Sequence, residues 1–150
     1  MGMELQMTGR VPCQERRLQV ARILLADAVP ASRLTLKSLL SRAGYGVDCA
    51  ATTGEALGKL DRNEYQLVLA DLRAESEEAS AGVLAYARQK DFRPATALLN
   101  SDLTGTFPVR ENVVRISHEN ISYLLGRIAE LIGARADRRL RNRIDRCWLA

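Results

Sequence analysis

Two aspartates, Asp27 and Asp71, each stand at the end of an apolar run, so both could contribute to one acidic site. The runs are Ala21-Arg-Ile-Leu-Leu-Ala-Asp27 and Gln66-Leu-Val-Leu-Ala-Asp71. Continuous apolar runs of this length are typical of strands that are buried on both faces of a parallel sheet. If the two strands are neighbours, both carboxylates emerge at one sheet edge, in the crevice where open α/β sheets bind ligands.

Strand and helix patterns alternate along the chain and would position these aspartates. Pro30 suits the first turn of a helix that Gly44 ends, and Thr52-Thr-Gly-Glu55 has capping-box spacing before a second helix. A third helix carries Ala79, Val83, Tyr86 and Ala87. Strict alternation implies a doubly wound open sheet with right-handed crossovers. The strands after the first are predicted at residues 47–51, 67–70, 95–99 and 113–116.

The alternation weakens in residues 101–112, which contain Gly105 and Pro108 and no helical stripe. We therefore expect the fourth helix to be reduced or missing. From Asn120 onward, a strong apolar stripe predicts an amphipathic helix that covers the sheet. This stripe consists of Ile121, Leu124, Leu125, Ile128, Leu131 and Ile132.

Length and composition are those of one soluble domain with appendages. The chain has 150 residues, of which 47% are hydrophobic and 27% are charged. Residues 1–20 are polar and aperiodic, so we interpret them as a flexible leader. No run approaches the roughly 18 apolar residues of a membrane helix, and the leader lacks the apolar centre of a signal peptide. These features predict a cytoplasmic protein without a membrane partner.

The successive landmarks of residues 21–132 resemble those of bacterial response-regulator receiver domains, the CheY-like family. They are Ile23-Leu-Leu-Ala-Asp27, the helix through Arg33 and Leu40, Gly44-Tyr-Gly-Val47, Gly54-Glu-Ala-Leu57 and Leu67-Val-Leu-Ala-Asp71. The resemblance implies a flavodoxin-like, doubly wound, five-stranded parallel sheet with strand order 2-1-3-4-5.

The resemblance also implies roles for the acidic residues. Asp71 matches the phosphoacceptor, whose carboxylate attacks a phosphohistidine or a small phosphodonor, and Asp27 matches the first member of the acidic pair that holds a divalent cation. The second, normally acidic position is Ala28. Magnesium would then keep fewer protein ligands. We expect that no cofactor is required and that magnesium binds weakly if at all.

Further positions depart from the family pattern. In the family, a threonine or serine ends the fourth strand. Its position aligns here with Leu99 or, if the alignment shifts by one or two residues, with Asn100 or Ser101. The family also has a lysine after the fifth strand. Its position is occupied here by Ser117, and Arg115 is the nearby basic residue. These four positions, Asn100, Ser101, Arg115 and Ser117, are the candidate switch or phosphate contacts.

Arg73, two residues after Asp71, is a further candidate. Its guanidinium could replace the metal by an ion pair with Asp71, or it could simply point to water. Taken together, the departures favour a pseudo-receiver that acts by protein contact in two-component or phosphorelay signalling, and not as an enzyme. Its partner would be a sensor kinase or a downstream signalling protein. The alternatives are a receiver phosphorylated on Asp71, a flavodoxin-like ligand binder and a DNA-binding effector.

The chain continues beyond the receiver-like region as a basic segment, residues 133–150. It carries six arginines and two aspartates, a balance of +4 that equals the net charge of the whole chain. Leu140, Ile144 and Trp148 would form a narrow apolar stripe on a helical extension. We expect this stripe to pack on the domain or in a homodimer, or else to bind a protein partner together with Arg141. Nucleic acid is the less favoured ligand, because sequence reading is unsupported.

Overall fold

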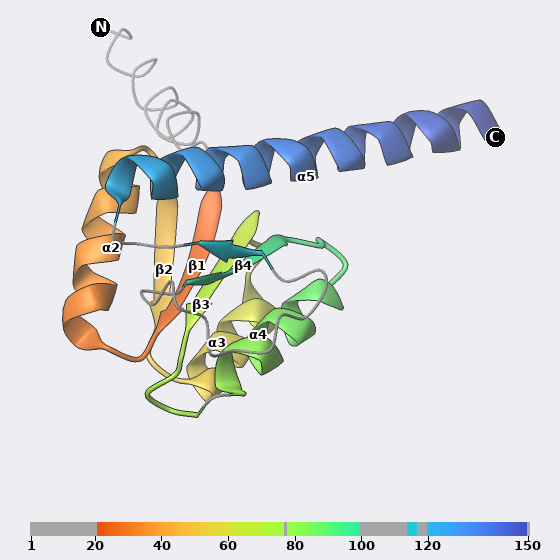
Figure 1. Cartoon of the computed structure of the whole chain (residues 1–150). Helices are drawn as coiled ribbons and strands as arrows, with labels where there is room; N and C mark the ends of the chain where they lie inside the picture. Colours follow the sequence, from red (N-terminus) through yellow and green to blue (C-terminus); the bar gives the residue numbers. More distant parts are fainter. Residues whose placement is uncertain (1–20, 77, 100–113, 117–119, 150) are drawn as a thin grey trace, which may run out of the picture.

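The computed structural model describes residues 21–76, 78–99, 114–116 and 120–149 and shows a parallel sheet covered by helices on both faces (Figure 1). The strands are β1 (Arg22–Asp27), β2 (Gly46–Ala50), β3 (Leu67–Asp71), β4 (Ala95–Leu99) and β5 (Arg115–Ile116). The described helices are α2 (Pro30–Arg42), α3 (Thr53–Arg62), α4 (Ala79–Arg88) and α5 (Ile121–Leu149).

The strand order is β2-β1-β3-β4-β5, with every neighbouring pair parallel, as the sequence predicted. Four strands of five or six residues make the body of the sheet, whereas β5 contributes only two residues. The prediction of a reduced or missing fourth helix falls on residues that the structure does not describe, and so does the predicted flexible leader, residues 1–20.

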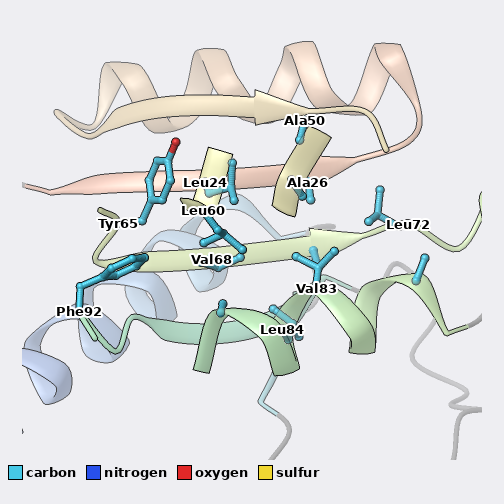
Figure 2. Close-up of a cluster of buried hydrophobic side chains, with 14 residues drawn as sticks. Leu24, Ala26, Ala50, Leu60, Tyr65, Val68, Leu72, Val83, Leu84 and Phe92 are labelled. Carbon is cyan, nitrogen blue, oxygen red and sulfur yellow. The ribbon is translucent and has the colours of Figure 1, made fainter. Parts of the chain in front are cut away.

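Side chains that alternate along β1 divide the core into two clusters. Leu24 and Ala26 face α3 and α4, together with Tyr65, Val83 and other buried residues (Figure 2). Ile23 and Leu25, which alternate with these two residues along β1, point to the opposite face of the sheet. There they pack against α2 and α5, in a cluster that contains Ile23, Leu25, Leu36, Leu40, Leu124 and Ile128. Burial on both faces explains why β1 and β3 are continuous apolar runs.

Local signals in the sequence set the ends of the helices. Pro30 occupies the first turn of α2, and Gly44 adopts a φ of 101° just beyond it, which glycine reaches without a steric penalty. The hydroxyl of Thr52 accepts a hydrogen bond from the Glu55 backbone N–H at 3.2 Å, as the predicted cap requires. These caps determine where the chain turns back toward the next strand.

Helix α5 is a single continuous helix that runs from the sheet into the basic extension. Asn120 caps its start by accepting a hydrogen bond from the Tyr123 N–H at 3.1 Å. Leu124 and Ile128 are buried against the sheet, and the helix then extends beyond the sheet (Figure 1). Within the described part of the chain, none of the helices combines the length and the apolar character needed to cross a membrane.

Candidate functional site

Asp27 and Asp71 lie side by side at the carboxyl ends of β1 and β3. Their Cα atoms are partners in the parallel register, so the convergence predicted from the sequence is confirmed. The backbone N–H of Ala28 donates to the Asp71 carbonyl at 3.2 Å, which ties the two strand ends together. This edge of the sheet is therefore a shared acidic site.

Asp27 is completely buried, although it lies at the end of its strand. Its Oδ1 accepts a hydrogen bond from the Val29 N–H at 2.9 Å, at the start of α2, while the buried Oδ2 has no hydrogen-bond partner among the described residues. Arg33 donates to the Asp27 backbone carbonyl at 2.8 Å. The carboxylate is thus held at the N-terminal end of α2 by a single side-chain hydrogen bond among the contacts described.

Asp71 is paired with a basic side chain from the loop that follows it. The Nε of Arg73 lies 3.0 Å from Oδ1 of Asp71, and a terminal nitrogen of the same guanidinium lies 3.4 Å from Oδ2. The Asp71 side chain is 12% exposed and the Arg73 side chain 31% exposed. A partly buried pair with a guanidinium on both carboxylate oxygens is stronger than an exposed ion pair. Of the two orientations open to Arg73, the ion pair is the one found.

Two residues that the sequence did not single out hold the loop after β3. The Ser80 hydroxyl is buried and accepts a hydrogen bond from the Leu72 N–H at 2.7 Å. The Glu75 carboxylate accepts hydrogen bonds from the backbone N–H and the hydroxyl of Thr53, at 2.9 and 3.0 Å. The partners are 8 and 22 residues apart, which is beyond the span of a capping or turn motif. These contacts connect the Asp71 loop to α3 and α4.

The remaining candidates for phosphate contacts are not placed. Asn100, Ser101 and Ser117 lie outside the described residues. Arg115 belongs to β5, but its side chain is not among those described. Their predicted roles therefore stay predictions.

The donor set at the acidic edge does not suit a divalent cation in this arrangement. Magnesium prefers several oxygen ligands in near-octahedral geometry. Position 28 is alanine, and both oxygens of Asp71 face the Arg73 guanidinium. Across the described ranges, no group of three or more His, Cys, Asp or Glu could hold a metal ion. The unpaired Oδ2 of Asp27 alone does not make a cation site.

In the basic extension, the apolar stripe does not pack on the domain. The exposed fractions of Leu140 and Ile144 are 56% and 45%, so the expectation that they pack back on the domain is wrong. The reason is geometric, because the outer part of α5 extends beyond the sheet (Figure 1). Arg141 is also exposed, and the side chain of Trp148 is not among those described. Pairing with a second copy or with a protein partner stays a prediction.

A parallel sheet of order 2-1-3-4-5, with two aspartates at the ends of its first and third strands, has the architecture of CheY-like response-regulator receiver domains. Comparison with solved structures shows the same class: the chain has the receiver-domain fold. Neither a scan against protein-family models nor a search of curated proteins finds a match.

Three solved structures illustrate this likeness. A CheY-like receiver domain from Methanospirillum hungatei shares 24% identity with a TM-score of 0.66, over 78% of this chain and 97% of that one. A complex of the histidine kinase ThkA with the response regulator TrrA matches at 25% identity and a TM-score of 0.61, over 73% of this chain and 97% of the matched chain. The receiver domain of the Pseudomonas aeruginosa kinase PA1611, which holds magnesium in its active-site cleft, matches at 21% identity and a TM-score of 0.63. The match covers 75% of this chain and 98% of that one.

Proposed function

We propose that this chain is a pseudo-receiver of two-component signalling, which acts through protein contacts and not through turnover. In this proposal, Arg73 takes the place of the metal ion. Its guanidinium supplies from within the chain the positive charge beside Asp71 that a bound cation would otherwise supply.

The ion pair between Arg73 and Asp71 carries this proposal. A phosphoacceptor carboxylate has to approach a phosphoryl group that is itself anionic, and the reaction needs cationic groups arranged around the transferred group. Here the cation contacts the attacking oxygens themselves, at 3.0 and 3.4 Å. Attack by Asp71 would first require this pair to break, and Ala28 supplies no second metal ligand in compensation.

A phosphorylation assay tests the proposal. The full chain is incubated with magnesium and either acetyl phosphate or beryllofluoride, and modification is followed by intact mass spectrometry and by fluorine NMR. The response regulator TrrA, whose structure with magnesium and beryllofluoride is known, serves as the positive control. We expect TrrA to be modified and this chain to remain unmodified.

Asp71→Asn and Arg73→Gln are the variants that distinguish the two interpretations. Stoichiometric modification of the wild type that disappears in Asp71→Asn would overturn the pseudo-receiver proposal and restore a phosphorylated switch. If Arg73→Gln alone gains modification, the guanidinium is shown to be the block.

A signalling protein is the partner class that we propose. The complex of ThkA with TrrA shows a receiver-type protein docked on a histidine kinase. In this chain the docking surface would include the exposed face of α5 around Arg141, Leu140 and Ile144. If Asp71 is not modified, the affinity of this chain for a histidine kinase should be the same with and without a phosphodonor, as measured by calorimetry.

A further inference from the structure

A pocket beside the start of β4, at the opposite end of the parallel strands from the acidic edge, is lined mainly by arginines. It lies between the turn from α4 to β4 and the outer part of α5, and its volume is about 260 Å³. Among the described residues that line it, five are arginines and none is acidic. The lining consists of Arg88, Arg93, Pro94, Arg135, Arg138, Arg139 and Asn142.

The spacing on α5 shows how this pocket arises. Arg135, Arg138, Arg139 and Asn142 follow one another at i, i+3, i+4 and i+7, so they share one face of the helix. Leu124, Ile128 and Leu131 form the same face one to three turns earlier, where it packs on the sheet. The face therefore changes from apolar to arginine at the point where the helix leaves the sheet and passes the α4–β4 turn.

One arginine of this face is fixed by the backbone of the turn. Arg135 is only 9% exposed and donates hydrogen bonds to the carbonyls of Phe92 and Arg93, at 2.6 and 3.1 Å. Arg139 donates to the Phe92 carbonyl as well, at 2.7 Å. These contacts attach α5 to the turn and hold the guanidinium groups in place before any ligand arrives. Preorganised groups bind a ligand with a smaller loss of conformational entropy.

Their positive charges are not balanced within the described part of the chain, where none of the five arginines forms an ion pair with a carboxylate. Burial is the main cause that lowers the pKa of Arg135, repulsion from Arg139 and Arg138 lowers it further, and Glu64 acts in the opposite direction. The cluster thus carries a positive potential that an anion would relieve.

Arg93 adds a second, independent observation. Its φ of 41° lies in the left-handed region that favours glycine, and in the described residues it is the only non-glycine residue with a positive φ. A strained conformation of this kind costs stability and points to a functional constraint at the position. An arginine here places a fifth guanidinium beside the pocket, which a glycine would not do.

We propose that this arginine pocket binds a small soluble anion that carries two or more phosphoryl groups. Guanidinium groups bind phosphate oxygens with pairs of parallel hydrogen bonds, and several guanidiniums match several phosphoryl groups. The lining contains no aromatic side chain on which a base could stack. Recognition would therefore depend on the phosphates, and an attached nucleoside would contribute little.

Isothermal titration calorimetry of the full chain tests this proposal with inorganic phosphate, pyrophosphate, tripolyphosphate and ATP. We expect affinity to rise with the number of phosphoryl groups, and ATP to bind within a few fold of tripolyphosphate. Each of Arg138→Gln and Arg93→Gly should weaken tripolyphosphate binding by roughly tenfold, because each removes a charge-assisted contact. Arg93→Gly also relieves the positive φ, so its thermal unfolding temperature should not fall.

Arg141→Gln is the matched control, since it removes one positive charge from the same helix at a position that does not line the pocket. Binding unaffected by Arg141→Gln supports a defined pocket. Equal weakening by all three substitutions would show a diffuse charge effect and overturn the proposal, and so would the absence of saturable binding in the millimolar range.

Two further measurements distinguish a small soluble anion from nucleic acid and from an anionic membrane surface. A random DNA duplex that binds with higher affinity than tripolyphosphate, and that is weakened equally by Arg141→Gln, would assign the arginines to nucleic-acid backbone and contradict the proposal. Cosedimentation with vesicles of anionic phospholipid, without any affinity for soluble tripolyphosphate, would contradict it as well. None of these outcomes depends on whether Asp71 is phosphorylated.

Discussion

Asp27 and Asp71 are register partners on adjacent parallel strands, but their carboxylates have different environments. Asp71 has the Arg73 guanidinium against both of its oxygens, whereas Asp27 is buried with an Oδ2 that finds no hydrogen-bond partner in the described structure. An anion that is buried without full pairing costs free energy. The pair therefore concentrates negative charge at a single sheet edge, where only the carboxylate of Asp71 is in contact with a basic group among the contacts described, since Arg33 reaches only the backbone carbonyl of Asp27.

Asp27→Asn should raise the free energy of unfolding at neutral pH by about 1 kcal/mol, because the amide removes the buried charge while its oxygen still accepts the Val29 N–H. Urea denaturation followed by circular dichroism measures this difference. Asp27→Ala is the control, since it also removes the acceptor. If both variants lose stability equally, the charge of Asp27 is not the source of the cost.

Removal of Arg73 should open the acidic edge to magnesium, and a second acid should strengthen the binding. We expect no detectable magnesium binding in the wild type, weak binding in Arg73→Ala, and binding at least roughly tenfold tighter in Arg73→Ala combined with Ala28→Asp, because magnesium then gains another oxygen ligand. Calorimetric titration with magnesium chloride measures these affinities. Tight magnesium binding by the wild type would contradict the role given to Arg73.

Because of Tyr65, the free energy of unfolding should decrease as the pH rises into the alkaline range. Its hydroxyl donates to Asp48 Oδ2 at 2.6 Å, and burial, followed by this hydrogen bond to a carboxylate, raises the tyrosine pKa above its ordinary value of 10.0. Above pH 10 the unfolded tyrosine loses its proton while the folded one keeps it, so the folded state loses stability as the pH rises.

Tyr65→Phe isolates this contribution. At neutral pH the variant should lose about 1 to 2 kcal/mol, because the Asp48 carboxylate loses a hydrogen-bond donor. The difference between wild type and variant should stay constant below pH 10 and shrink above it, when urea denaturation is repeated at increasing pH. A difference that grows at alkaline pH would contradict the assigned pKa direction.

Arg135 should be the main attachment of the outer part of α5. Arg135→Ala leaves the Arg93 carbonyl without this donor and weakens the contact to Phe92, so we expect a loss of about 1 to 3 kcal/mol in the free energy of unfolding. Arg139→Ala should cost less, because Arg135 still donates to the Phe92 carbonyl. Amide hydrogen exchange should show faster exchange beyond residue 135 in the first variant. Equal exchange in both variants and in the wild type would contradict the attachment.

Much of the fold was predictable from the sequence, since each signal is local. Apolar runs mark strands that are buried on both faces, and Pro30, Gly44 and Thr52 mark helix ends through their backbone preferences. The site was predictable in part. Parallel strands bring their carboxyl ends to one edge, so the convergence of Asp27 and Asp71 follows from the strand pattern.

Other features depended on contacts between distant residues. The buried hydrogen bond from the Leu72 N–H to the Ser80 hydroxyl, and those from Thr53 to the Glu75 carboxylate, need the loop after β3 to fold against two helices. In the sequence, the arginines of α5 appear only as part of a basic extension. Their role as a pocket wall appears only because the α4–β4 turn lies beside them.

The sequence by itself determined the order of elements, the parallel sheet and the two acids at its edge, because these depend on periodicity and on residues next to each other in the chain. Only the tertiary structure decided that Arg73 turns to Asp71 and not to water, that Leu140 and Ile144 remain exposed, and that five arginines converge. Side-chain orientation depends on the space and charge that distant segments supply, and no local pattern encodes these.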